Sequence, residues 1–368
     1  MNKMGFGFLR LPRINPDDEQ SVDFEKVCAL VDRFLALGGN YFDTAYNYLS
    51  GASETSLREA LVKRHPRESF RIADKLPTWK IKSLEDRERY FEEQRARCGV
   101  DYFDVYLLHS LNQKNYAICR EFDLFAYLKE LKEKGLAKKI GFSYHDSPEL
   151  LDQILSENPG LDHVLLQINY LDWESGVLQA RRLYETAVRH GVKVLVMEPV
   201  KGGSLAKLPD EIERKLREME PERSMPSWAV RFAQGLDGVE IVLSGMNTIG
   251  QIEDNLQDVQ PLSSAEQNAL AWAADEMRSS IAIACTGCAY CEPGCPQSIA
   301  IPRYFALYNE YARSPREVWK MVHGYRDIAE NRGKAGDCIG CGACEEHCPQ
   351  KLSIIENLKK VAEAFENA

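Results

Sequence analysis

The sequence predicts an α/β protein in two parts: a (β/α)8 TIM barrel, followed by a mostly α-helical ferredoxin-like domain. Two observations lead to this prediction. Over about the first 260 residues, short apolar runs alternate with amphipathic helical stretches, and the C-terminal region carries one cysteine spacing twice. At 368 residues the chain also exceeds the usual size of one domain, so two domains are expected.

The barrel prediction depends on eight strand-like runs, each followed by a helical stretch. Eight β/α units in about 260 residues fit the size of a (β/α)8 barrel. A doubly wound sheet is the alternative, but no Gly-x-Gly-x-x-Gly follows the first strand, as its dinucleotide crevice requires. The strands are expected at 4–11, 41–45, 70–75, 103–109, 139–143, 163–169, 192–197 and 239–244, and the helices at 24–37, 53–63, 84–98, 122–134, 148–156, 176–190, 226–235 and 251–259.

Eight of the eleven cysteines lie in two runs with the spacing Cys-x2-Cys-x2-Cys-x3-Cys-Pro. In this pattern three thiolates of one run bind an iron–sulfur cube, and the fourth binds the cube of the other run. The sequence therefore predicts two [4Fe–4S] clusters. The first is expected on Cys285, Cys288, Cys291 and Cys348, and the second on Cys338, Cys341, Cys344 and Cys295.

Two other uses of the cysteines are less favoured. A disulfide framework is typical of secreted domains, and the first 30 residues do not have the pattern of a signal peptide. Structural zinc typically takes four ligands from pairs of cysteines, rather than tandem runs of four. The remaining Cys28, Cys98 and Cys119 are scattered and are expected to be ordinary buried thiols.

These patterns divide the chain into a barrel (1–262), a connecting helix (263–280), a ferredoxin-like domain (281–351) and a C-terminal helix (352–368). The 42 residues between the cysteine runs include aromatic-rich helical stretches at 304–312 and 315–322. We interpret these stretches as packing between domains rather than as a binding site.

Composition restricts the partners. Hydrophobic residues make up 44% and charged residues 28% of the chain, as in soluble globular proteins. The net charge of −10 argues against a nucleic-acid partner and is compatible with docking a basic redox protein. No apolar run approaches the ~20 residues that cross a bilayer. Because exposed clusters are sensitive to oxygen, a reducing cytoplasm is the expected location.

Polar residues at the ends of three neighbouring strands predict a catalytic site. The second strand ends at Asp43 with Tyr48 in the loop after it, the third ends at Lys75, and the fourth at His109. In a (β/α)8 barrel the C-terminal ends of the strands carry the chemistry. A phenol has a pKa near 10, and a lysine held by an aspartate is expected to lower it toward the working range of an acid–base catalyst. A histidine orients a carbonyl oxygen by hydrogen bonding.

The order Asp-Thr-Ala-x-x-Tyr, then Gly-Ala-Ser-Glu, Lys75 and Leu-Leu-His resembles the aldo-keto reductase family over residues 1–260, and in particular its subgroup with a C-terminal ferredoxin-like extension. The resemblance implies that Asp43, Tyr48, Lys75 and His109 form the family's catalytic tetrad. It implies hydride transfer from a nicotinamide to a carbonyl carbon, with Tyr48 protonating the oxygen, or the reverse oxidation of an alcohol.

The resemblance also implies cofactor contacts along the later strands. A serine and a glutamine bind the nicotinamide carboxamide, one loop passes the pyrophosphate, and the last segment binds the adenosine. The matching residues are Ser143 and Gln167, then Met197, Pro199, Gly202, Gly203 and Ser204, then Ser244, Gly245, Gln251, Asp254 and Asn255.

Some positions depart from the family pattern. Gly245 and Gln251 stand where members that prefer NADP usually have a lysine and an arginine, so NAD is slightly favoured, although Lys201 or another base would compensate. Met197 replaces an aromatic residue that stacks on the nicotinamide, and Tyr144 replaces an asparagine. These two changes predict a looser nicotinamide site, or one shaped for another ring.

The two halves pose a coupling problem, because a hydride carries two electrons and a cluster passes one. A flavin is the usual cofactor that divides the pair. Three functions therefore remain open: a hydride-transferring reductase, which is favoured; a ferredoxin-linked reductase with a flavin or radical intermediate; and a non-enzymatic electron carrier. The sequence does not identify the substrate. Residues near the predicted strand ends that could line a polar aromatic pocket are Arg10, Trp79, Tyr144, His145 and Trp173.

Overall fold

The computed structural model describes residues 3–175, 178–257, 260–313 and 318–366. The contacts divide the chain into two units. The barrel unit consists of Met1–Glu174, Gln179–Val200 and Glu222–Gln267, and the helical unit consists of Ser175–Leu178, Lys201–Pro221 and Asn268–Ala368. Residues 201–221 therefore belong with the C-terminal region by their contacts, although they lie within the stretch 1–262 assigned to the barrel from the sequence.

Eight parallel strands close the barrel in sequence order, which confirms the predicted (β/α)8 architecture. The ring closes where Met4 of the first strand pairs with Val242 of the last. The strands are β1 (Met4–Gly7), β2 (Tyr41–Asp43), β3 (Arg71–Leu76), β4 (Phe103–Leu111), β5 (Ala137–Tyr144), β6 (His163–Gln167), β7 (Lys193–Met197) and β8 (Val239–Ser244).

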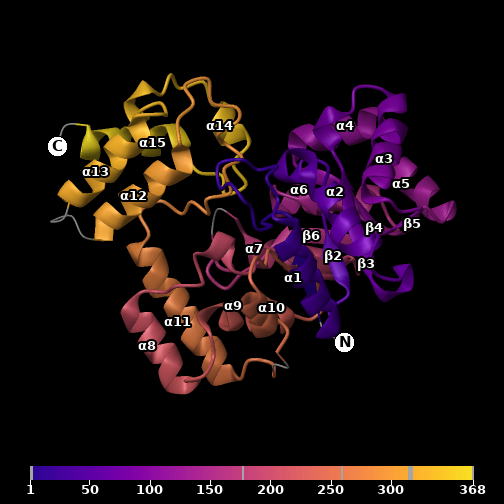
Figure 1. The fold of residues 1–368 in the computed structure, drawn as a ribbon, viewed down its shortest axis with the longest axis horizontal. Helices are drawn as coiled ribbons and strands as arrows, with labels where there is room; N and C mark the ends of the chain where they lie inside the picture. Colours follow the sequence, from indigo (N-terminus) through magenta and orange to yellow (C-terminus); the bar gives the residue numbers. More distant parts are fainter. Residues whose placement is uncertain (1–2, 176–177, 258–259, 314–317, 367–368) are drawn as a thin grey trace. The chain divides into compact units, whose positions relative to one another are not determined.

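Helices follow the strands and supply the outer layer of the barrel unit (Figure 1). Several begin at a side chain that caps the first turn, as Ser83 does for α3 and Ser147 for α6, because the first backbone N–H groups of a helix lack partners within it. These helices are α1 (Phe24–Ala36), α2 (Ala52–Leu57), α3 (Leu84–Cys98), α4 (Gln113–Glu121), α5 (Leu124–Glu133), α6 (Pro148–Glu157), α7 (Ala180–Arg189), α9 (Met225–Gln234) and α10 (Ile249–Asn255).

Alternation of side chains along the strands produces two apolar layers. A small inner cluster, which includes Tyr41, Leu107, Leu165 and Leu243, fills the barrel. A larger outer cluster packs the strands against the helices. The β5–β6 contact is so close that a Cβ on Gly141 would lie 1.9 Å from the carbonyl oxygen of His163, so only glycine fits at that position.

The helical unit has its own apolar core, in which Tyr304, Phe305, Tyr325 and Phe365 are buried. In Figure 1 its C-terminal helices are coloured orange to yellow, and α12 packs against both α13 and α15. The helices are α8 (Asp210–Met219), most of α11 (Ser264–Ser280), α12 (Ile301–Arg313), α13 (Val318–Ala329), α14 (Ala343–Glu346) and α15 (Ile354–Phe365).

The strands and most helices begin and end near their predicted bounds, with some differences. The first strand ends at Gly7 rather than at residue 11, and α4 and α8 were not predicted. The predicted helices at 176–190, 251–259 and 315–322 lie partly outside the described residues, and their described parts contain α7, the end of α10 and the start of α13. Within the described part of the chain, no helix is both long and apolar enough to cross a membrane.

Candidate active site and cysteine pockets

The four predicted catalytic residues meet in the barrel unit. Lys75 of β3 donates from Nζ to Oδ1 of Asp43 at 2.6 Å and to the carbonyl oxygen of Thr44 at 2.7 Å. The side chains of this pair are 0% and 4% exposed, so the ion pair is buried. Nζ of Lys75 also lies 4.8 Å from the centre of the Tyr48 ring.

The loop after β2 places Tyr48 by an unusual turn. Leu49 and Ser50 both have a φ of 50°, and Gly51 has a φ of 92°, so three residues in succession adopt left-handed conformations. Such a conformation is unfavourable for residues other than glycine and is found where function requires it. The turn brings the Tyr48 ring to 5.8 Å from the ring of His109, measured between centroids.

The acidity of Tyr48 differs from the sequence expectation. Burial raises the pKa of Tyr48 well above its usual value, and the negative charges of Asp43, Asp74 and Glu198 act in the same direction. The net shift is therefore upward, opposite to the direction expected from Lys75, because burial and these carboxylates raise the pKa of Tyr48. The phenol stays protonated at neutral pH, which suits a proton donor.

His109, at the end of the predicted strand, is buried beside Tyr48 and Trp79. Burial lowers the pKa of His109 well below its usual value, and the charges of Lys75 and His145 lower it further. The imidazole is therefore neutral at neutral pH. Its Nδ1 is buried and has no hydrogen-bond partner among the described residues, so a polar group of a ligand would satisfy it.

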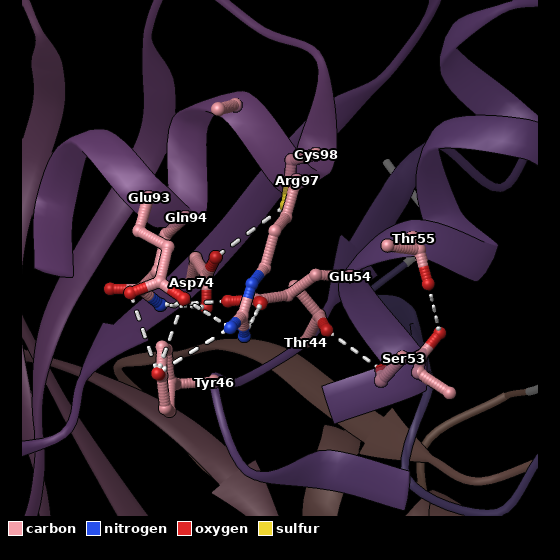
Figure 2. A network of polar contacts seen from close by, with 12 residues as sticks. Thr44, Tyr46, Ser53, Glu54, Thr55, Asp74, Glu93, Gln94, Arg97 and Cys98 are labelled. Carbon is pink, nitrogen blue, oxygen red and sulfur yellow. Dashed lines mark hydrogen bonds and ion pairs between the residues drawn. The ribbon is translucent and has the colours of Figure 1, made fainter. Parts of the chain in front are cut away.

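Behind Lys75 lies a buried polar network that the sequence did not assign (Figure 2). Gln94 of α3 donates from Nε2 to Oδ1 of Asp74 at 2.8 Å, to Oε1 of Glu54 at 3.1 Å and to the carbonyl oxygen of Lys75 at 3.0 Å. The backbone N–H of Lys75 donates to the same Asp74 oxygen at 2.7 Å. Asp74 and Gln94 thus hold the backbone of Lys75, the lysine that the sequence predicts to be catalytic.

Two carboxyl groups share this network. Burial raises the pKa of both Glu54 and Asp74, and the charge of Glu54 raises that of Asp74 further. Arg97 lies against Glu54, with Nη1 3.1 Å from Oε2, and the thiol of Cys98 donates to Asp74 across 3.6 Å. Two buried carboxyl groups this close favour holding a proton between them. The position of Asp74 next to Lys75 in the sequence is a signal that could have indicated Asp74. No sequence signal indicated Gln94.

The residues predicted to contact a nicotinamide cofactor lie at the C-terminal ends of β5 to β8 or in the segments after β7 and β8. Ser143 accepts a hydrogen bond from the N–H of Ser110 at 2.7 Å, and Gln167 donates to Asp172 at 3.0 Å. Gln167 pairs in register with Met197, so these two side-chain positions are neighbours at the ends of β6 and β7. Pro199, two residues beyond Met197, is buried.

The segment after β8 is held by its own hydrogen bonds. Asn255 donates to Ser244 at 3.2 Å, Gln251 accepts from the N–H of Asn247 at 2.7 Å, and Asp254 accepts from the hydroxyl of Ser224 at 2.5 Å.

A cation does lie beside this segment, although not at the predicted positions. A Cβ on Gly245 would be 3.2 Å from Cβ of Arg10, which follows β1. Nη2 of Arg10 is buried and has no hydrogen-bond partner among the described residues. Arg10 therefore offers a positive charge next to Gly245.

The remaining predicted residues have other surroundings. Tyr144 is buried and donates from its hydroxyl to the carbonyl oxygen of Ser147 at 2.6 Å, and Trp173 packs on Tyr184 and Phe232. Tyr144 and Trp173 are therefore packing residues in this structure. Gly202, Gly203 and Ser204 belong to the helical unit, where Gly202 lies against the backbone of Thr286.

The eight motif cysteines line two pockets of the helical unit. Each pocket takes three cysteines from one run and the last cysteine of the other. The first is lined by Cys285, Cys288, Cys291 and Cys348, and the second by Cys338, Cys341, Cys344 and Cys295.

The chemistry of these pockets fits a group that binds thiolates. Burial raises the pKa of Cys285 and Cys344 to about 11, so these sulfurs need a metal to hold them deprotonated at neutral pH. A single zinc ion requires four ligands at about 2.3 Å from one point. Among the described residues, no three His, Cys, Asp or Glu side chains form a group that could hold a metal ion. Four cysteines line each pocket, which is the number of thiolates that hold a [4Fe–4S] cluster.

Comparison with known proteins agrees with both halves of the structure. A profile of the Aldo/keto reductase family matches residues 3–276. The chain belongs to this family. A second profile, described as a 4Fe-4S dicluster domain, matches residues 284–353. This aldo/keto reductase thus combines an oxidoreductase barrel with a C-terminal 4Fe–4S dicluster domain, as the sequence predicted.

Relatives match part of this chain. An uncharacterized oxidoreductase of Schizosaccharomyces pombe is 25% identical over 270 residues, which are 70% of this chain and 81% of that protein. An aldo-keto reductase of Mycobacterium sp. (strain KMS) is 30% identical over 173 residues, or 46% and 58% of the two chains.

Solved structures give the same fold. An aldo-keto reductase of Bacillus halodurans in its holo form has a TM-score of 0.60 at 23% identity and covers 74% of this chain and 91% of its own. A Klebsiella pneumoniae aldo-keto reductase in complex with NADPH has a TM-score of 0.57 at 18% identity, with 73% and 89% covered. At these identities the likeness shows the fold alone.

Proposed function

We propose that this chain is an NAD(P)H-dependent oxidoreductase that transfers a hydride between a nicotinamide cofactor and a small carbonyl or alcohol substrate. The observation that carries this proposal is the buried Lys75–Asp43 ion pair beneath a protonated Tyr48, with the neutral His109 beside it. The nicotinamide supplies the hydride when it is bound. The residues of the chain supply the proton and the orientation.

Each residue of the site has a separate part in reduction. Tyr48 donates its phenolic proton to the carbonyl oxygen as the carbon receives the hydride, so an alcohol forms and Tyr48 becomes a phenolate. Lys75 stabilises that phenolate by its charge, and Asp43 holds Lys75 in place. His109, as a neutral imidazole, donates a hydrogen bond to the same oxygen and orients it.

The nicotinamide carboxamide is expected at Ser143 and Gln167, with the phosphates and adenosine along the segments after β7 and β8. The Klebsiella structure is described as a complex with NADPH. The sequence argument for NAD depended on a missing cation near Gly245, and Arg10 provides one. We therefore expect Arg10→Leu to weaken NADPH binding by about tenfold and leave NADH nearly unaffected, measured as the KM for each cofactor.

We also propose that the helical unit binds two [4Fe–4S] clusters, each held by three cysteines of one run and one of the other. The composition of the two pockets supports this assignment. A second function for the clusters is electron exchange with the barrel through a flavin or radical intermediate, or with a redox partner protein. The joining of a dicluster domain to a reductase barrel favours this second candidate.

The decisive test of hydride transfer is Tyr48→Phe. This change should reduce NADH- or NADPH-dependent carbonyl reduction by about 100-fold or more, since it removes the proton donor. Tyr46→Phe is the matched control, because Tyr46 donates instead to Glu93 and its loss should change turnover only a few-fold. Full activity in Tyr48→Phe would overturn the proposal.

The two roles of the clusters are separated by Cys291→Ala. If the clusters stand apart from turnover, the folded variant keeps most of its activity; if they carry electrons to the barrel, turnover is lost. An absorbance spectrum of protein purified without oxygen shows directly whether a flavin is bound.

A further inference from the structure

The Gly-Ala-Ser-Glu motif lies directly after the turn that follows Tyr48, and the proposed hydride transfer assigns it no part. Its last two residues, Ser53 and Glu54, lie in α2 and are both 0% exposed. A buried hydroxyl or carboxyl group is costly unless other polar groups bind it. Figure 2 shows that the two side chains contact different neighbours. Each of these neighbours in turn contacts Lys75.

Ser53 closes the loop that carries Tyr48. Its hydroxyl donates to the carbonyl oxygen of Phe8 at 3.0 Å, and the hydroxyl of Thr44 lies 2.7 Å from the same Ser53 oxygen. A serine hydroxyl has a single hydrogen, which Ser53 uses on Phe8, so Thr44 is the donor in the second contact. This hydrogen bond joins the two ends of the loop around Tyr48. The carbonyl oxygen of Thr44 also accepts from Nζ of Lys75 at 2.7 Å.

Glu54 reaches the backbone of Lys75 through Gln94. Nε2 of Gln94 donates to Oε1 of Glu54 at 3.1 Å and to the carbonyl oxygen of Lys75 at 3.0 Å. The hydroxyl of Tyr106 donates to the oxygen of the same amide at 2.6 Å, which fixes the orientation of the amide. Glu54 therefore helps to hold the residue that binds the Lys75 backbone.

The strand ladder explains why side chains bind that backbone. The last pair between β2 and β3 is at Ala73, whose carbonyl oxygen also accepts from the N–H of Thr44 at 3.0 Å. Lys75 is two residues further along β3, so its backbone groups point to the same edge, where β2 has already ended. Asp74 binds the N–H of Lys75 at 2.7 Å, and Gln94 binds its carbonyl oxygen. These contacts take the place of a strand.

We propose that Ser53 and Glu54 are positioning residues, which together fix the separation between the Tyr48 hydroxyl and the Lys75 ammonium. This inference rests on the proposed function. Ser53 holds the loop of the proton donor, and Glu54 holds the strand of the cation through Gln94. When Tyr48 gives up its proton, the ammonium stabilises the phenolate, and the attraction between two charges falls with their distance. Loosening either hold should therefore slow the chemical step.

The test is a single turnover of carbonyl reduction by the full chain, followed as NADH or NADPH oxidation with benzaldehyde or cyclohexanone as the probe. In Ser53→Ala the rate constant should fall about tenfold, because the donor leaves its productive position. The solvent deuterium isotope effect on this rate constant should increase as proton donation slows, and the KM for the cofactor should stay unchanged. A merely structural loss of folded protein would lower the amplitude and leave the rate constant and isotope effect unchanged.

A matched control separates position from packing. Ser56→Ala removes another buried hydroxyl of α2, which donates to the carbonyl oxygen of Ala52 within the same helix at 2.7 Å. It should leave the rate constant and the isotope effect unchanged.

Two variants of Glu54 give a second measurement, which decides if Ser53→Ala does not fold. Glu54→Met removes the acceptor for Gln94 and should slow the chemical step about tenfold. Glu54→Gln keeps an oxygen that accepts from Gln94 and should recover most of the rate constant. Both changes remove the same carboxyl group, so the two variants differ in the acceptor rather than in charge.

The outcomes distinguish the positioning role from the proposed function. Native rate constants in Ser53→Ala and Glu54→Met, an equal loss in Ser56→Ala, or equal losses in Glu54→Gln and Glu54→Met would each overturn the positioning role alone. No turnover of either probe by the unmodified protein, or turnover that Tyr48→Phe does not lower, would overturn the proposed hydride transfer, and the positioning role with it.

Discussion

The barrel unit and the helical unit each bury a lysine, and the two lysines lie in different surroundings. Lys75 forms an ion pair with Asp43 at 2.6 Å, so its counter-ion is encoded in the neighbouring strand. Lys201 donates to the amide oxygen of Gln350 at 3.2 Å, and Gln350 is one of the residues that line the first cysteine pocket. The buried lysine of the barrel thus lies in a site made by strand residues, whereas the buried lysine of the helical unit lies beside a residue that lines a cysteine pocket.

The same difference extends to the packing of the two units. The barrel strands are joined by a closed ladder of hydrogen bonds around a filled interior. The core of the helical unit includes cysteines among its apolar side chains, with Cys291 and Cys344 both buried. A site whose ligands lie within the core couples folding to metal binding.

The largest expected effect comes from removing the buried Lys75–Asp43 ion pair of the barrel. Lys75→Met leaves the Asp43 carboxylate buried without its partner, which should destabilise the protein by about 3–5 kcal/mol. Turnover should fall by about 100-fold or more, since the phenolate of Tyr48 loses its stabilising charge. Urea unfolding and kcat/KM measure the two effects. Lys82→Met, at an exposed position, is the control, and equal losses in both variants would contradict the assignment.

Removal of the metal should destabilise the helical unit. Treatment with a strong chelator under reducing conditions should lower the hydrogen-exchange protection of α12, α13 and α15 at least tenfold, because the thiols no longer bridge the two cysteine runs. The strands β2 to β6 should keep their protection. Parallel loss in strands and helices would show that the barrel also depends on the clusters, contrary to the comparison drawn above.

The ease of prediction also differs between the two regions. The β/α alternation and the cysteine motifs could be predicted because each is a local pattern that repeats along the sequence. Asp43, Tyr48, Lys75 and His109 were found for the same reason, since each ends a strand or follows one. The contacts of Gln94 with Asp74 and of Arg10 with Gly245 were not predicted. Each contact forms only through tertiary packing, which brings α3 and the loop after β1 close to the site.

The sign of the Tyr48 pKa shift was also beyond the sequence. Predicting it required the burial of the phenol and the summed charges of Asp43, Asp74 and Glu198, which come from three separate strands or strand ends. The sequence identified Lys75 and Asp43 near Tyr48, but not the burial of the phenol or the nearby charges of Asp74 and Glu198.

The smallest expected effect concerns the proton held between Glu54 and Asp74 in the barrel unit. The pKa of Asp74 is higher in the folded protein than in the unfolded chain, so the folded state binds more protons once the pH exceeds about 4. Stability therefore falls as the pH rises toward the folded pKa, by about 1.4 kcal/mol per pH unit for each proton retained only by the folded state.

Asp74→Asn removes this dependence, because an amide does not titrate. The variant loses a hydrogen-bond acceptor for Cys98 and should be no more stable than the native protein at pH 5. Between pH 5 and 8 its free energy of unfolding should fall less than that of the native protein, so the difference between the two moves in favour of the variant. Urea unfolding of the barrel at several pH values measures this trend, with Asp101→Asn as an exposed carboxyl control. Parallel pH profiles for native protein and Asp74→Asn would mean that Asp74 carries no extra proton, and that the barrel balances Glu54 through Arg97 alone.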